Sequence, residues 1–192
     1  MVFISKIFKL ILLFLENYNI KKENQGKLIM QLPTHLIAGI LIQYIISIII
    51  PTPTWLSVLL VIIIAFCSHF FLDALSRSTY HPPERIHDNF WLMWHIFVYL
   101  TGLGIIILHF WNYWLGMLFA NLPDLWDWYT LRNIASRKNN PDWAKQYYLH
   151  PIADKVRSSL FMWMPNLIYK RTGIIPELIL IILWFVILFF FG

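Results

Sequence analysis

Two things are scarce in this sequence of 192 residues: cysteine and charge. The single cysteine, Cys67, lies inside an apolar run, so the chain has no internal disulfide, no cysteine-based zinc site and no redox pair. Charged residues make up 13% of the chain, against roughly 25% in typical soluble domains. This shortage excludes an ordinary soluble domain and indicates a chain that places most of its length in an apolar environment.

Long apolar runs take the place of the missing charge, and they raise the mean hydropathy to +0.62. Several of these runs approach the ~20 residues that a helix needs to cross the hydrocarbon core of a bilayer. The predicted transmembrane spans are 34–50, 55–75, 90–110, 111–131 and 174–191. The sequence therefore predicts an all-α fold, a polytopic membrane helix bundle of about five transmembrane helices with further amphipathic helices at the surface.

We find no internal repeat and no low-complexity linker, so residues 30–192 are predicted to form a single membrane domain. Pro51 and Pro53 separate the first two spans. The third and fourth spans follow each other without a polar linker, and the aromatic stretch His109–Trp114 is predicted to be a tight interfacial hairpin, because Trp and Tyr favour the headgroup level.

Two segments outside the spans are predicted to be surface helices. Residues 1–29 are expected to be peripheral, an interfacial helix and a linker, because the apolar run Phe3–Leu15 is too short to span and is interrupted by lysines. The segment 133–173 is too long for a structureless loop and is predicted to be a cytoplasmic helical loop. Its apolar residues recur at helical spacing, namely Ile152, Val156, Leu160 and Trp163.

The net charge of +5 indicates orientation in a membrane rather than nucleic-acid binding. All fifteen Lys and Arg residues fall before the first span, between spans two and three, or between spans four and five. Positive residues mark the cytoplasmic side, so the prediction is a multi-pass protein of the cell membrane with its N-terminus inside and its C-terminus outside. Membrane lipids are the expected partners and nucleic acid is not. The sequence leaves the oligomeric state open.

Ionisable residues at membrane depth are costly, about 2.5–3.5 kcal/mol each near a helix centre, so each requires a partner, a metal or a water-filled cavity. His69 and Asp73 lie late in the second span, and their i, i+4 spacing places them on one helical face. Such a pair either binds one metal, or the carboxylate orients the imidazole. A simple His–Asp hydrogen bond at the helix end is the alternative.

Asp124 and Asp127 form a Pro-Asp-x-x-Asp motif in the last third of the fourth span. At i and i+3 both carboxylates are expected to face one way and to repel each other, and a divalent cation would neutralise them. The alternative is a helix that is already leaving the membrane, with both carboxylates solvated.

His35 opens the first span and His95 lies near the start of the third. Each of them alone is more typical of a packed interfacial side chain than of a ligand. Together with the two pairs above, however, they give three histidines and three aspartates near the inner ends of four helices. That is the ligand inventory of a hydrolytic Zn²⁺ or Mn²⁺ site. The predicted metal ligands are His35, His69, Asp73, His95, Asp124 and Asp127.

Further residues near the cytoplasmic ends are candidates for substrate binding. Arginine side chains bind phosphate oxygens in a bidentate fashion. The alternative is that these arginines are ordinary positive residues of the cytoplasmic side. His81 lies in a stiff His-Pro-Pro-Glu stretch, and His150 repeats the i, i+4 spacing with Asp154. The predicted substrate-binding residues are Arg77, His81, Arg85, Arg132 and His150.

Three motifs resemble the membrane-bound metal-dependent hydrolases, a family of small four- or five-span proteins that includes a LexA-regulated inner-membrane member. They are Thr34-His-Leu-Ile-Ala-Gly39, Ser68-His-Phe-Phe-Leu-Asp73 and Leu122-Pro-Asp-Leu-Trp-Asp127. The resemblance implies a metal-dependent hydrolase of phosphoesters or lipids. The order of the motifs, and Pro-Asp-Leu-Trp-Asp in place of Pro-Asp-x-Asp-His, would make this chain a divergent or rearranged member.

The sequence therefore favours a membrane-embedded hydrolase that acts on a phosphoester or lipid-like substrate at the cytoplasmic face, with Asp73 or Asp127 as general base. A transporter or ion relay could use the same residues, but the outer half of the predicted bundle has few polar groups to line a path. A non-catalytic membrane adaptor is the third hypothesis, in which the polar cluster is only a packed network.

Overall fold

The computed structural model describes residues 32–52, 54–80, 82 and 89–191, and this part of the chain is helical with no strand. The prediction of an all-α fold is confirmed. The longer helices are α2 (Leu32–Ile49), α3 (Trp55–Leu75), α4 (Asn89–Asp124), α5 (Arg132–Arg137), α6 (Pro141–Lys145), α7 (Pro151–Leu160) and α8 (Ile174–Phe191). Short 3-10 turns form η1 (Ser76–Ser78) and η3 (Arg171–Gly173), and η2 (Leu125–Leu131) is a π-helix. The predicted peripheral segment 1–29 lies outside the described residues.

Three helical stretches of the described chain are long and apolar enough to cross a membrane, namely Leu32–Ile49, Trp55–Ser78 and Asn89–Arg137. The predicted spans 90–110 and 111–131 both fall in the third stretch, which is 49 residues long. Much of the apolar surface of these stretches faces outward, as at Trp55, Ile63 and Leu100. Contiguous exposed apolar surface of this kind is rare in soluble monomers and fits a lipid environment.

Helix α4 changes direction at Tyr113, whose φ of −129° and ψ of 20° leave the helical range. The side chain of Gln43, from α2, braces this kink. Its amide nitrogen donates to the carbonyl of Asn112 at 2.9 Å, and its amide oxygen accepts from the N–H of Gly116 at 2.8 Å. Backbone groups that the kink removes from the helix ladder are thereby satisfied.

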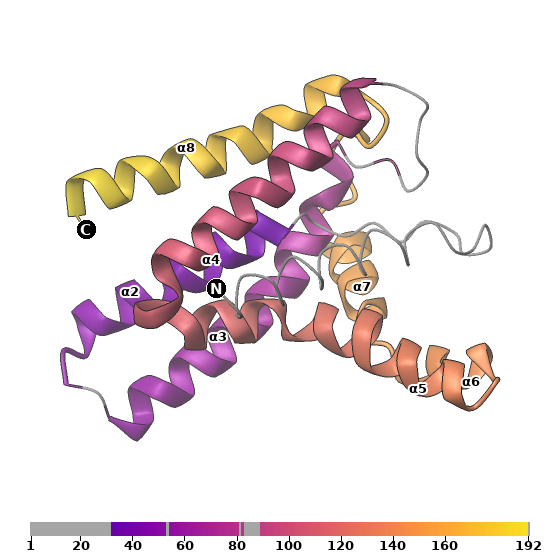
Figure 1. Ribbon diagram of the computed structural model, residues 1–192, viewed down its shortest axis with the longest axis horizontal. Helices are drawn as coiled ribbons and strands as arrows, with labels where there is room; N and C mark the ends of the chain where they lie inside the picture. Colours follow the sequence, from indigo (N-terminus) through magenta and orange to yellow (C-terminus); the bar gives the residue numbers. More distant parts are fainter. Residues whose placement is uncertain (1–31, 53, 81, 83–88, 192) are drawn as a thin grey trace, which may run out of the picture.

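The two halves of α4 run in opposite directions along α2 (Figure 1). In the first half of α4, Gly102 lies against Leu32 at the start of α2. The kink lies beside Gln43, and in the second half Gly116 lies against Gly39, which is closer to the start of α2. Gly39 and Gly116 contact each other backbone to backbone, so that a Cβ on either one would collide with the carbonyl oxygen of the other. The reversal returns the end of α4 to the beginning of α2.

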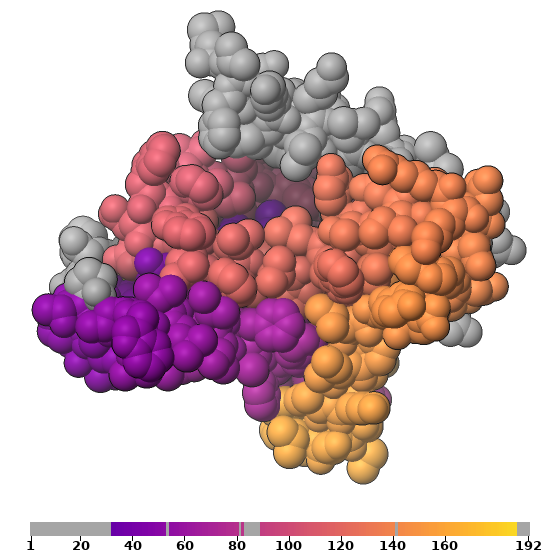
Figure 2. Space-filling model, turned by 90° about the horizontal axis from the view of Figure 1, so that it is seen from below, coloured from indigo at the N-terminus to yellow at the C-terminus, as the bar shows by residue number. Residues whose placement is uncertain are grey.

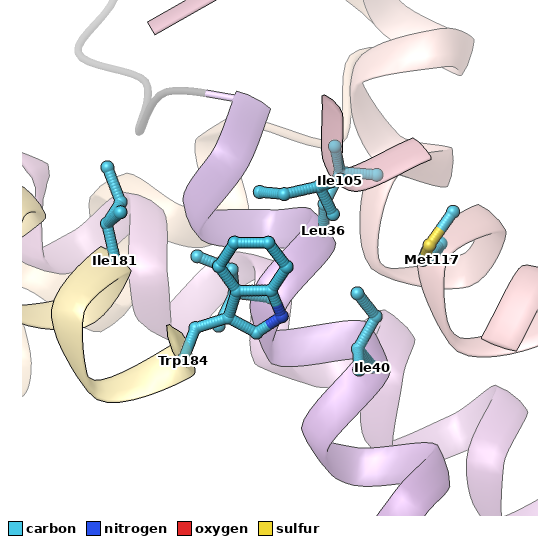
Figure 3. Packing of buried hydrophobic residues seen from close by; sticks show 7 residues of the cluster. Leu36, Ile40, Ile105, Met117, Ile181 and Trp184 are labelled. Atoms are coloured by element: carbon cyan, nitrogen blue, oxygen red, sulfur yellow. The ribbon is translucent and has the colours of Figure 1, made fainter. Parts of the chain in front are cut away.

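A hydrophobic cluster holds α2, both halves of α4 and α8 together (Figure 3). Trp184 from α8 lies against α2, and Ile105 and Met117 come from the two halves of α4. The cluster consists of Leu36, Ile37, Ile40, Ile105, Met117, Ile181 and Trp184. Its burial fixes the helices that carry the polar residues described below.

Helices α5 and α6 lie at the end of the molecule remote from the turn that joins α2 and α3 (Figures 1 and 2). Helix α3 runs between these ends. It begins with a capping box in which Thr54 and Ser57 exchange side-chain and backbone hydrogen bonds. It ends at Ser76, whose hydroxyl donates to the carbonyl of Asp73 at 2.6 Å. The polar residues of the candidate site gather near the C-terminal end of α3.

Candidate metal centre

The His69–Asp73 pair lies in the last two turns of α3, and both side chains are fully buried. Their i, i+4 spacing brings Nε2 of His69 to 3.3 Å from Oδ2 of Asp73. The Nδ1 atom of His69 lies 2.8 Å from the carbonyl oxygen of Ala120, which can only accept a hydrogen bond. Nδ1 therefore carries a proton, and Nε2 faces the carboxylate.

His35 reaches the same carboxylate from the first turn of α2. Its ring stacks on the ring of His69 with centroids 4.2 Å apart, and its Nε2 lies 3.3 Å from Oδ1 of Asp73. The two oxygens of Asp73 thus face two different histidines. The side chains of His35 and Asp73 are both fully buried. The packing of α2 against α3 brings them together.

Asp124 enters from the end of α4, which the reversal at Tyr113 has brought back to this layer. Its Oδ1 atom lies 3.9 Å from Nε2 of His69 and accepts a hydrogen bond from Nε1 of Trp128 at 3.0 Å. Asp124 is the most accessible member of the cluster, because 23% of its side chain is exposed. The cluster therefore opens on the Asp124 side.

His150 completes the cluster from the residue directly before α7. Its Nε2 lies 3.2 Å from Oδ2 of Asp73 and 3.1 Å from Oδ1 of Asp124. Burial alone would lower the pKa of His150, but the carboxylates of Asp124, Asp127 and Asp73 outweigh it and raise the pKa to about 11. The three carboxylates thus favour a positive charge at His150, which either a proton on its imidazole or a bound cation would supply.

Asp127 lies on the π-helix η2 and faces the other side of His150. Its two oxygens accept from the N–H of Leu149 at 2.9 Å and from the N–H of His150 at 3.0 Å, and Oδ2 also lies 2.5 Å from Nδ1 of His150. Because the π-helix has wider turns than an α-helix, the side chains at i and i+3 do not point the same way. Asp127 consequently orients the imidazole, whereas Asp124 faces the Nε2 atoms.

Among the described residues, two groups of donors converge closely enough to hold a metal ion: His35, His69 and Asp73, and His69, Asp124 and His150. Both groups use His69, so the two groups could hold only one ion at a time. The Nε2 atoms of His35, His69 and His150 are buried and make no geometrically satisfactory hydrogen bond within the described chain. Each of them lies 3.1–3.3 Å from a carboxylate oxygen of Asp73 or Asp124.

The structure gathers five of the six predicted metal ligands, His35, His69, Asp73, Asp124 and Asp127, together with His150, which was predicted to bind substrate. The predicted ligand His95 is not part of either donor group, and its Nδ1 lies 2.7 Å from the carbonyl of Trp91 in its own helix. Arg132 is exposed and lies over the ring of Trp128. Arg77 is half-buried, and its carbonyl accepts from the N–H of Leu167.

The predicted substrate-binding residues His81 and Arg85 lie outside the described residues. Sequence reasoning placed His150 only among the candidate substrate-binding residues, and it did not single out Arg157. Both residues lie on the face of α7 that also carries the buried Ala153. This i, i+3, i+7 spacing is the signal that could have found them.

Comparisons of the chain with protein-family models, with curated proteins and with solved structures give no match.

Proposed function

We propose that this protein is a membrane-embedded, metal-dependent hydrolase. The motifs around His35, His69 and Asp124 resemble those of the membrane-bound metal-dependent hydrolases, and this resemblance supports the proposal. The metal would be Zn²⁺ or Mn²⁺, bound where the first two helices, the end of α4 and the start of α7 meet. Imidazole and carboxylate donors suit both ions.

One observation carries the proposal: two imidazole nitrogens and two carboxylate oxygens from three segments of the chain lie close together in a ring of His–Asp contacts. Nε2 of His69 lies 3.3 Å from Oδ2 of Asp73 and 3.9 Å from Oδ1 of Asp124. Nε2 of His150 lies 3.2 Å and 3.1 Å from the same two oxygens. Zinc–ligand bonds of about 2.0–2.2 Å imply donor separations of roughly 3.3–3.6 Å around a tetrahedral ion. Three of the separations, at 3.1–3.3 Å, are close to the lower end of that range, and the 3.9 Å separation between His69 and Asp124 is wider.

When bound, a divalent metal would polarise the scissile ester and lower the pKa of water in the site. Asp73 would take up the proton of that water as the general base. Its Oδ2 belongs to the donor cluster, and its Oδ1 faces His35. Asp127 holds His150 in position rather than reacting itself.

The substrate would approach on the side of Asp124, the one partly exposed member of the cluster. Its neighbours there are exposed apolar or aromatic side chains, Leu125, Trp126 and Tyr129. A polar group that must reach the metal through such a surface favours an amphiphilic substrate, such as a lipid or a lipid-like phosphoester. The exposed guanidinium of Arg132 would attract an anionic group to this side.

The membrane placement belongs to the same proposal. Leu32–Ile49 and Trp55–Ser78 would each cross the bilayer once, and Asn89–Arg137, which reverses at Tyr113, would cross it twice. The segment that carries α5, α6 and α7 would then lie at the cytoplasmic face. The metal site would then sit near the depth of the lipid headgroups.

The proposal is tested by metal analysis and by hydrolysis assays on the full chain purified in detergent. Wild-type protein should contain about one Zn or Mn per chain, and His69→Ala and Asp124→Ala should lose it. His109→Ala and Asp142→Ala are matched controls outside the cluster and should keep the metal. Folded wild-type protein that binds neither ion would sink the proposal.

A structural metal site is the second candidate, and the closed ligand set favours it. Four protein donors around a tetrahedral ion are typical of structural sites, whereas catalytic sites keep a position for water. In this case the metal would only tie the helices together, as in a non-catalytic membrane adaptor. If metal-loaded protein hydrolyses neither phosphoesters nor lipids, the metal site is structural.

A further inference from the structure

Helix α7 touches the rest of the site through a narrow face. Ala153 is buried, His150 directly before the helix is buried, and Arg157 is half-buried, while Ile152, Asp154 and most of the remaining residues are exposed. Positions 150, 153 and 157 share one helical face by their spacing. The imidazole of His150 and the guanidinium of Arg157 are the polar groups of this face that approach α3 within the described part of the chain.

Arg157 binds the last turn of α3 at several points. Its Nη2 donates to the carbonyl of Asp73 at 2.7 Å and to the hydroxyl of Ser76 at 3.3 Å, and its Nε donates to the carbonyl of Ala74 at 3.3 Å. Carbonyls at the end of a helix lack donors of their own and carry partial negative charge. A guanidinium is well suited to bind several of them at once, because its donors are held in a rigid planar fork.

Asp73 thus contacts both ends of the narrow face of α7, His150 at one end and Arg157 at the other. Its side chain faces His150, 3.2 Å away, and its main-chain carbonyl accepts from Arg157 two helical turns later. We infer that Arg157 is a positioning residue of the metal centre: it docks α7 on the end of α3 and so keeps His150 within ligand distance of Asp73. This inference rests on the proposed metal site.

Two other contacts set the size of the expected effect. Asp127 also holds His150, so the loss of Arg157 should loosen this ligand without releasing it completely. The ion pair between Arg157 and Asp154 lies on the surface, with the Asp154 side chain 59% exposed, and such pairs contribute little. Asp154→Ala therefore leaves the docking contacts intact and is the matched control.

The experiment uses Co²⁺ as the probe with the full chain in detergent. Tetrahedral Co²⁺ absorbs visible light strongly and six-coordinate Co²⁺ weakly, so the spectrum reports whether His150 is still a ligand. Arg157→Ala should weaken Co²⁺ binding about 10–100-fold, as expected when a residue that supports a ligand is lost. Its spectrum should shift toward that of His150→Ala, whereas Asp154→Ala should match the wild type.

The double variant His150→Ala/Arg157→Ala separates positioning from other roles. If Arg157 acts through His150, the double variant should bind Co²⁺ no more weakly than His150→Ala alone. Arg157→Lys, which keeps the charge but can reach fewer carbonyls, should be intermediate, and it replaces Arg157→Ala if that variant fails to fold.

Either of two results would overturn the inference while leaving the metal site standing. One is an unchanged Co²⁺ affinity and spectrum in Arg157→Ala, even with a lower melting temperature, because Arg157 would then be only structural. The other is an additive loss in the double variant. A folded wild-type protein that binds no Co²⁺ contradicts the proposed metal site itself, and this result is read before any variant.

Discussion

The carboxylate of Asp127 and the imidazole of His150 form a dyad in which Asp127 faces the nitrogen that points away from the candidate metal. Oδ2 lies 2.5 Å from Nδ1, while the Nε2 atom of the same ring faces the other carboxylates of the cluster. A carboxylate in this place fixes the tautomer and the orientation of a ligand histidine and raises its basicity. The dyad therefore explains why two aspartates three residues apart would have different roles.

Asp127→Asn should lower the affinity for Zn²⁺ about 10–100-fold without removing the metal at saturation, because the amide keeps the size of the side chain but loses its charge. Titration calorimetry on the purified chain measures the affinity. Asp154→Asn is the control on the exposed face of α7. A complete loss of stoichiometric metal, like that expected for His69→Ala, would show instead that Asp127 is a direct ligand.

The sequence predicted much of this cluster because depth and spacing are readable without a structure. His69 and Asp73 are four residues apart on one helix, and their shared face follows from helix geometry alone. His35 and Asp124 were placed by their distance from the predicted span ends. The close packing of α2 against α3 then turned a common depth into direct contact, with Nε2 of His35 3.3 Å from Asp73.

Two features were beyond sequence reasoning, and each has a physical cause. The π-helix η2 changes the direction of Asp127 relative to Asp124, and no spacing rule for an α-helix anticipates it. The spacing of His150, Ala153 and Arg157 indicates a shared face, but the docking of that face on α3 depends on tertiary contacts, which local patterns do not contain. The apolar residues Ile152 and Leu160 suggested the helix but remain exposed, so they do not mark the face that meets the site.

His35→Ala should keep about one metal per chain and lose catalysis. Four donor atoms remain without His35, but Asp73 loses the imidazole beside its Oδ1 and hence its partner in proton uptake. The rate of hydrolysis of bis(4-nitrophenyl) phosphate should fall about 10²–10⁴-fold, the usual contribution of general acid–base groups. His109→Ala, a histidine beside Trp184 outside the cluster, should have the wild-type rate. Loss of metal from His35→Ala would make His35 a ligand and contradict this assignment.

Removal of the metal should destabilise the protein, because the donors come from three separate segments of the chain, namely α3, the end of α4 and the residue before α7. An ion present at one hundred times its dissociation constant stabilises the folded state by about 2.7 kcal/mol. Chelator should therefore lower the melting temperature of the wild type by several degrees, and readded Zn²⁺ or Mn²⁺ should restore it. The melting temperature of His69→Ala should not respond to chelator. An equal response of both proteins would place the metal elsewhere.

The proposed orientation places α7 and its neighbours at the cytoplasmic face. In a Cys67→Ser background, Ser159→Cys on the exposed side of α7 should react with a membrane-impermeant maleimide only in inside-out vesicles. Thr52→Cys, in the turn between α2 and α3, is the matched exposed position at the other end and should react only in intact cells. The opposite pattern would reverse the proposed orientation, and with it the side from which a substrate arrives.

The contact between Gly39 and Gly116 holds α2 against the returning half of α4, and it should be intolerant of any side chain. A methyl group on either residue meets the other's backbone carbonyl, which cannot rotate away as a side chain could. Gly39→Ala should therefore destabilise the protein by about 1–3 kcal/mol, the usual effect of overpacking. It should also weaken metal binding, because the returning half of α4 carries the donor Asp124. Gly104→Ala is the matched control, since nothing lies within 4 Å of its added Cβ, and it should be neutral or slightly stabilising. Equal melting temperatures for the two variants would mean that the helices can separate at this crossing without cost, and the reversal at Tyr113 would then not depend on it.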